Sequence, residues 1–320
     1  MLELCANELE KQVDVKQVFI GLMERLADYA TTASEVTETI KEKINLYELF
    51  KKNIDTLIEH SDASDFKNVL YLEAAFLKFT IRCYPTQAEY VNDILKSAVR
   101  SCSLHTSHMD EECQSFIVKI LTLPLDSLSV AVLTMDEYPN LMKHLQFTRR
   151  REVAQQIAKI VAKNDLQLAD DHLVGQLLVF IEPLLKKLPD SENISDVLFK
   201  DEQTNVARLV FQINNEDPAV VWGILRSFIE KFREGGPERI RFTYPSTIFK
   251  LLQLARQIRA SNPEAEPKVF KKIFELSRTL INELSESQPR VSIKLYLQFL
   301  QIVNELDRGK AYDEFTYVPV

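Results

Sequence analysis

The stretch Gly235-Gly236-Pro237-Glu238-Arg239-Ile240-Arg241-Phe242-Thr243-Tyr244-Pro245 interrupts a long series of apolar patterns with helical spacing. The chain contains six glycines in 320 residues, and two of them are adjacent here. Because glycine tolerates positive φ and proline donates no backbone hydrogen bond, Gly-Gly-Pro ends a preceding helix. Pro245 stands directly before the next apolar-periodic run and is expected to begin the following helix. We therefore expect a short ordered loop in which Phe242 packs between two helix pairs. Arg239 or Arg241 should contact carbonyls or acidic side chains of a neighbouring helix.

Apolar residues recur at spacings of three and four on both sides of this connection, which is the pattern of amphipathic helices. The spacing predicts helices over 15–30, 40–58, 65–82, 86–105, 110–122, 148–163, 170–187, 202–214, 218–233, 245–260, 265–283 and 290–307. Pro183 should kink or split the helix over 170–187. Thr86 to Glu89 form a capping box, and Asp217-Pro218 place a cap residue before a first-turn proline. No stretch shows convincing strand alternation.

The predicted helices pair off at intervals of roughly 40 residues, which is typical of HEAT-like and armadillo-like arrays. The pairs cover 14–59, 65–105, 110–145, 148–187, 202–233 and 245–283. About a dozen helices exceed what the core of one compact bundle usually encloses. The sequence therefore predicts an all-α fold, a HEAT/armadillo-like α-solenoid of antiparallel helix pairs. We expect a single solenoid segment over 1–320, with a soft division near 188–201.

The composition argues against several other classes of protein. The net charge is −8 and the pI about 5.4, so the chain has no electrostatic footprint for nucleic acid. Scarce glycine argues against Rossmann folds, P-loop proteins and β-rich enzymes, whose turns need it. Four cysteines at irregular spacing with no signal peptide indicate reduced thiols in the cytosol. No apolar run is long enough for a transmembrane helix.

A search for chemical sites finds two candidates, and each has a simpler structural interpretation. Cys102, His105, His108 and Cys113 could supply zinc ligands, but their order is mixed, and buried cysteines beside exposed loop histidines are the favoured interpretation. The sequence thus predicts no metal and no cofactor. Arg149, Arg150 and Arg151 are candidate partner-binding residues, although a basic run at a helix start is more often a solvated face. Trp222, the one tryptophan, is expected in the core. No nucleophile elbow, phosphate-binding loop or carboxylate pair is present, so no enzyme is predicted.

The Gly-Gly stretch also resembles a pattern of one known family. In the retromer scaffold subunit, vacuolar protein sorting-associated protein 35, a Gly-Gly-x-x-Arg-x-x-Phe-Thr-x-Pro connection joins two helices of the C-terminal solenoid. The residues that carry this resemblance are Gly235, Gly236, Arg239, Arg241, Phe242, Thr243 and Pro245, with Arg208, Asp217 and Pro218 upstream. Shorter similar stretches follow in order along the chain, at 13–17, 22–27, 82–85, 90–91, 199–203 and 206–209.

The resemblance implies a non-catalytic scaffold in endosomal cargo retrieval, including retrograde transport from endosome to Golgi. It also implies a cytoplasmic location, peripheral on the endosome membrane through the complex. The alternative is another helical-repeat adaptor, importin-like or coat-adaptor-like, that shares only the architecture. One tryptophan and no asparagine ladder count against a transport receptor.

Departures from the family pattern limit the expected partners. Family members are much longer, and the Pro-Arg-Leu-Tyr motif that anchors their arrestin-fold subunit has no counterpart here, so binding of that subunit is not expected. The C-terminal half of the family solenoid wraps around the metallophosphoesterase-fold subunit, vacuolar protein sorting-associated protein 29. This chain resembles the middle of the scaffold, so binding of that subunit is expected to be weak. Ala311 to Phe315 look like a helix just beginning, so we expect a fragment or short form of a longer solenoid.

Overall fold

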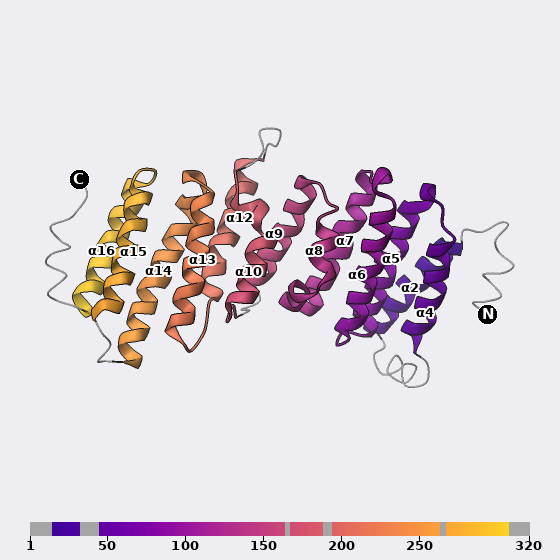
Figure 1. Ribbon diagram of the computed structural model, residues 1–320, viewed down its shortest axis with the longest axis horizontal. Helices are drawn as coiled ribbons and strands as arrows, with labels where there is room; N and C mark the ends of the chain where they lie inside the picture. Colours follow the sequence, from indigo (N-terminus) through magenta and orange to yellow (C-terminus); the bar gives the residue numbers. More distant parts are fainter. Residues whose placement is uncertain (1–14, 33–44, 164–166, 188–193, 263–266, 307–320) are drawn as a thin grey trace. The chain divides into compact units, whose positions relative to one another are not determined.

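The computed structural model describes residues 15–32, 45–163, 167–187, 194–262 and 267–306 (Figure 1). Within these ranges every regular element is a helix, and extended backbone pairs only in one isolated parallel bridge between Leu168 and Ile213. Backbone contacts divide the chain into two compact units, Met1–Gln156 and Ile157–Val320. No helix of the described ranges is long and apolar enough to span a bilayer.

Unit 1 is built around α5 (Phe66–Cys83), which packs against four other helices. Its neighbours are α2 (Val15–Thr32), α4 (Leu46–Glu59), α6 (Ala88–Leu104) and α7 (Glu111–Leu128), and α8 (Glu137–Met142) packs on α6 and α7. Three short 3-10 turns connect them, Ala63–Asp65, Thr106–His108 and Ser129–Thr134. Because α5 is surrounded, it buries residues on most of its circumference, including Phe66, Leu72, Phe76 and Phe79.

Unit 2 repeats this organisation around α14 (Pro237–Ser261), which packs against helices that precede and follow it. Those helices are α12 (Asp196–Leu209), α13 (Pro218–Glu234), α15 (Pro267–Ser285) and α16 (Pro289–Leu306). The shorter α10 (Asp171–Phe180) and α11 (Glu182–Leu185) pack on α13, and the 3-10 turn Val210–Gln212 follows α12. The helix α9 (Phe147–Lys163) contains the boundary between the units.

The predicted all-α solenoid fold is confirmed, because in each unit successive helices stack on their neighbours in chain order (Figure 1). The expectation of a single segment with a division near 188–201 stays a prediction. Residues 1–14, 33–44 and 307–320 lie outside the described ranges, and with them the start of the helix expected over 40–58 and the one expected at Ala311.

Local signals fixed several helix ends correctly and missed others. The helix expected over 170–187 splits at Ile181, directly before Glu182-Pro183, as the proline predicted. Asp217 caps α13, since its Oδ1 accepts a hydrogen bond from the Ala219 N–H at 2.8 Å. The capping box at Thr86 was wrong: Gln87 is the N-cap of α6, and no side chain caps that end. The helix expected to end at residue 122 continues to Leu128 with Pro124 inside it.

Candidate functional site

The connection between α13 and α14 is only two residues long, Gly235 and Gly236. The Gly235 N–H donates to the carbonyl of Phe232 at 3.1 Å and so closes α13, and Gly236 has a φ of 75°, which turns the chain before Pro237 opens α14. The expectation that Pro245 begins the helix was wrong, because Pro245 lies inside α14. Pro237 already supplies the first-turn proline, and the packing of α14 on four helices outweighs the one backbone bond that Pro245 cannot make.

The two glycines are required for different reasons. Gly235 is buried, and a Cβ placed on it would lie 2.5 Å from the carbonyl oxygen of Leu185 and 2.8 Å from Cδ of Arg239. A Cβ on Gly236 would meet nothing within 4 Å, but the positive φ disfavours any residue with a side chain. The absence of a side chain at Gly235 therefore lets the end of α13 approach the backbone of α11.

Arg239 occupies the space that this close approach creates. Its side chain is buried with 3% exposed, and Nε donates a hydrogen bond to the carbonyl of Leu184 at 3.0 Å. The same carbonyl accepts a bond from Nε2 of Gln203 at 2.9 Å. The guanidinium carbon lies 5.2 Å from the ring centroid of Phe199 on α12. The expected contact with a neighbouring carbonyl is confirmed for Arg239, which joins α14 to α11 and α12.

Phe242 completes the junction at its edge. Its ring meets that of Phe199 edge to face, with centroids 6.0 Å apart, and Arg241, an exposed residue, lies 4.8 Å above the Phe242 ring. Phe242 is half-buried, so it packs against α12 but is not enclosed between helix pairs as expected. Thr243 is buried and donates through Oγ1 to the Arg239 carbonyl at 3.3 Å. These residues hold helices together and assemble no reactive group.

Replacing Phe242 with alanine is expected to lower the free energy of unfolding by about 1–2 kcal/mol. Truncation of a fully enclosed ring would cost about 3–5 kcal/mol. The Phe242 ring is already partly exposed to solvent in the folded chain, so its truncation removes less buried area. Urea unfolding of purified variants measures the change. The control is Phe249→Ala on the same helix, where 42% of the side chain is exposed and the cost should be near zero. Equal effects at both positions would contradict the packing role of Phe242.

A second polar contact ties the junction to the next helix pair. The Tyr244 hydroxyl donates to Oε2 of Glu283 on α15 at 2.7 Å, and Arg233 at the end of α13 forms an ion pair with the same carboxylate at 2.8 Å. Burial and the nearby carboxylate raise the pKa of Tyr244, so the hydroxyl stays a donor. Three successive helices are thereby connected through Glu283.

The remaining residues of the Gly-Gly resemblance are not part of this junction. Asp217 and Pro218 open α13 at its opposite end, and Arg208 is exposed on α12. The structure thus brings together at the junction Gly235, Gly236, Arg239, Arg241, Phe242 and Thr243. Pro245 lies further along α14, and Arg208, Asp217 and Pro218 lie apart from the junction.

The sequence missed a groove at the opposite end of α13. Trp222 was expected in the core, but it is half-buried and lines a groove of about 670 Å³ between α13, the end of α14 and the start of α15. The walls are mainly apolar and include Pro218, Ala219, Leu254, Ile258, Val269 and Ile273. Lys268 and Lys272 stand on the α15 side, both exposed and without an ion pair in the described part of the chain. A groove of this size and lining suits an apolar side chain flanked by acidic groups.

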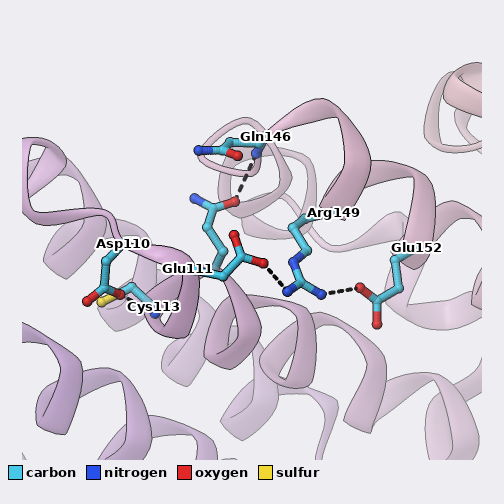
Figure 2. Close-up of polar contacts among 7 residues, drawn as sticks. Asp110, Glu111, Cys113, Gln146, Arg149 and Glu152 are labelled. Carbon is cyan, nitrogen blue, oxygen red and sulfur yellow. Dashed lines mark hydrogen bonds and ion pairs between the residues drawn. The ribbon is translucent and has the colours of Figure 1, made fainter. Parts of the chain in front are cut away.

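The three consecutive arginines do not form one common surface. Arg149 pairs with Glu111 at the start of α7 and with Glu152 at 2.8 Å (Figure 2). Arg150 is half-buried and Arg151 is buried. Consecutive helical residues point in directions about 100° apart, which explains the separation. Partner binding by these arginines stays a prediction.

The buried side chain of Gln114 reinforces the contact between α7 and α9. Its Oε1 accepts from the Gln146 N–H at 2.9 Å (Figure 2). Its Nε2 donates to the carbonyl of His144 at 3.0 Å. Asp110 caps α7 by accepting from the Cys113 N–H at 2.7 Å. The start of α9 is therefore fixed to the start of α7 by an ion pair and by both groups of one amide.

The favoured interpretation of the cysteine and histidine cluster is confirmed for three of its four residues. Cys102 and Cys113 are buried, and His108 is exposed. His105 is half-buried instead, with its ring centroid 5.2 Å from that of Phe66. Burial raises the pKa of the Cys102 thiol, and burial together with the neighbouring Asp110 raises that of Cys113 to about 11. Among the residues that the structure describes, no group of three or more histidine, cysteine, aspartate or glutamate side chains could hold a metal ion.

The helices stack in chain order, and buried polar residues such as Arg239 and Gln114 join neighbouring helices. These features define a helical-repeat protein of the α-solenoid class. The family model that matches the chain is that of vacuolar protein sorting-associated protein 35, over residues 1–318. The chain therefore belongs to this family.

Several named relatives share this similarity over most of the chain. Vacuolar protein sorting-associated protein 35B of Arabidopsis thaliana is 29% identical over 267 residues, which cover 81% of this chain and 33% of the relative. Vacuolar protein sorting-associated protein 35 of Dictyostelium discoideum is 28% identical, and that of Schizosaccharomyces pombe is 21% identical. In both cases the match covers 34% of the relative's length. The chain thus spans about a third of the length of these curated relatives.

Proposed function

We propose that the chain acts as a non-catalytic scaffold subunit of retromer in endosomal cargo retrieval, including retrograde transport from endosome to Golgi. The observation that carries this proposal is the family match over residues 1–318. The structural role of the Gly-Gly residues supports the proposal, because Gly235 and Arg239 stabilise the packing of α11, α13 and α14. The alternative, an importin-like or coat-adaptor-like module, would share the architecture without this family-wide similarity.

The proposed location is cytoplasmic and peripheral on the endosome membrane, through the assembled complex. The net charge of the chain is −8, so the chain as a whole is not attracted to anionic lipid. Membrane association would therefore depend on partner subunits.

We expect the two partner subunits of the family to differ in their binding to this chain. The metallophosphoesterase-fold subunit, vacuolar protein sorting-associated protein 29, should bind weakly, because the chain spans about a third of its longer relatives. The arrestin-fold subunit should not bind, because these 320 residues contain no Pro-Arg-Leu-Tyr motif.

We place the contact with the metallophosphoesterase-fold subunit at the groove of unit 2. The resemblance assigns that subunit to the C-terminal half of the solenoid, and the groove lies between residues 217 and 273 of this chain. Lys268 and Lys272 would complement acidic groups of the subunit around an apolar side chain that contacts Trp222. The groove therefore offers both parts of an interface, an apolar centre and a charged rim.

A binding assay with purified subunits tests both parts of the proposal. We expect isothermal titration calorimetry to show weak binding of the metallophosphoesterase-fold subunit, with a Kd in the micromolar range, and no binding of the arrestin-fold subunit. The substitution Trp222→Ser should weaken the binding about tenfold or more, as is usual for the loss of an aromatic interface residue.

Phe249→Ser, which removes an exposed aromatic residue outside the groove, is the matched control and should leave the binding unchanged. Tight binding of the arrestin-fold subunit, or no binding of either subunit, would overturn the proposed scaffold role. Equal effects of Trp222→Ser and Phe249→Ser would overturn only the assignment to the groove.

A further inference from the structure

One carboxyl group in unit 1 is completely enclosed. Glu73 lies in the middle of α5 with 1% of its surface exposed. Its Oε1 accepts hydrogen bonds from the Ser97 hydroxyl at 2.7 Å and from the Ser101 hydroxyl at 3.2 Å, both on α6. Its Oε2 is buried and has no hydrogen-bond partner in the described part of the chain. A buried carboxylate normally requires donors on both oxygens, so the second oxygen calls for an explanation.

The enclosed carboxyl group lies where three helices meet. A cavity of about 20 Å³, large enough for roughly one water molecule, separates α4, α5 and α6 beside Glu73. Lys51 of α4 and Asp93 of α6 also line this cavity, and their Nζ and Oδ2 atoms form an ion pair at 2.6 Å. Lys51 is the one cation among the described lining residues, and it is currently bound to Asp93.

The charges that face Glu73 come from the two helices on either side of the cavity. Burial is the main cause that raises the pKa of Glu73 to about 7; the serine hydroxyls of α6 oppose this rise, and Asp55 of α4 adds to it. Cys102 of α6 is also near, but burial raises the pKa of its thiol and keeps it neutral. The helices α2 and α7 also pack on α5, and none of their described titratable groups contributes to the Glu73 shift.

We propose that Glu73 is a proton-binding switch, whose loss of a proton draws the Lys51 ammonium across the cavity from Asp93 to Oε2 of Glu73. The proton released by Glu73 goes to solvent, and Lys51 keeps its own proton and charge throughout. The exchange replaces an ion pair between α4 and α6 by one between α4 and α5. Packing of α4 against α6, which includes the stacked rings of Tyr47 and Tyr90 at 3.7 Å, thereby depends on pH near neutrality.

The substitution Glu73→Gln tests the titration, because the amide keeps an acceptor for the serines and cannot ionise. Glu73 has a higher pKa in the folded chain, about 7, than its ordinary value of 4.5. The folded chain therefore binds this proton more tightly. The contribution of Glu73 to stability is complete below pH 4.5 and is lost as the pH rises through 7. This pKa difference corresponds to at most about 300-fold in the unfolding equilibrium constant.

We expect the ratio of the unfolding equilibrium constants, Glu73→Gln over the unaltered chain, to fall by up to about 300-fold between pH 4.5 and pH 8. Native-state hydrogen exchange, followed in peptides from α5 and α6 of the full chain, measures the unfolding equilibrium constant of each variant. Glu89→Gln, an exposed position on α6, is the matched control, and its ratio should stay constant over the same range. A Glu73→Gln ratio that also stays constant would overturn the proposal.

The exchange of ion pairs is tested by nuclear magnetic resonance of the Lys51 ammonium and the Asp93 carboxyl. Both signals should shift between pH 6 and pH 8 with the midpoint of Glu73, and in Glu73→Gln neither should shift. If Glu73 titrates in this range while both signals remain constant, Glu73 is a static buried carboxyl and the switch is excluded. A Glu73 midpoint near 4.5 would exclude it as well.

Discussion

Replacing Gly235 with valine is expected to lower the free energy of unfolding of unit 2 by about 3 kcal/mol. The new Cβ would lie 2.5 Å from the Leu185 carbonyl oxygen, and backbone atoms cannot move aside as a flexible side chain can. Gly235 has an ordinary helical φ of −77°, so the cost comes from crowding between α13 and α11 and not from backbone strain. Urea unfolding followed by fluorescence of Trp222, the one tryptophan, reports on this unit.

Gly223 on the same helix provides the matched control. A Cβ there would meet the Asp171 carboxylate oxygens at 3.6 and 3.7 Å, which is ordinary contact. Gly223→Ala should raise the free energy of unfolding by about 0.5–1 kcal/mol, because alanine favours a helix interior. If Gly235→Val were equally harmless, the close approach of α13 to α11 would be refuted.

Replacing Arg239 with alanine is also expected to lower the free energy of unfolding of unit 2 by about 3 kcal/mol. The substitution removes a charged donor from the Leu184 carbonyl, removes the contact with the Phe199 ring and leaves a cavity. The alanine variant also avoids the desolvation penalty of burying the guanidinium, and this gain offsets part of the loss. Thermal or urea unfolding measures the change.

Arg241→Ala is the control two residues away, and it should change the free energy of unfolding by less than about 0.5 kcal/mol, because Arg241 is exposed. Arg239→Leu separates the two parts of the effect. Leucine refills part of the space but leaves the carbonyl without this donor, so its cost should lie between those of the two alanine variants. Equal costs for Arg239→Ala and Arg241→Ala would contradict the packing role.

Much of the fold followed from local signals in the sequence. Apolar spacing predicted nearly every described helix, because burial of one face is what stabilises each of them. The adjacent glycines and the Asp217 cap fixed the two ends of α13 for reasons of backbone geometry alone. Pro245 was misassigned because helix propensity is a weak effect, and the packing of α14 against four helices overrides it.

The candidate site was only partly predictable, because residue type does not determine burial. Arg239 and Arg241 have the same chemistry and stand two residues apart, yet the first is enclosed and the second is exposed. Trp222 lies at the edge of a groove that exists only where α13, α14 and α15 meet. Glu73 stands in an apolar run, and no local pattern reveals that it lines a cavity together with Lys51.

By itself, the sequence determined the helical class, most helix ends and the family resemblance, since these depend on periodicity and on residues adjacent in the chain. The tertiary structure alone decided which arginine joins three helices, that Gly235 must lack a side chain beside Leu185, and which carboxyl is cut off from water. The physical reason is that burial, close approach and desolvation are properties of residues far apart in sequence. No pattern within one helix specifies them.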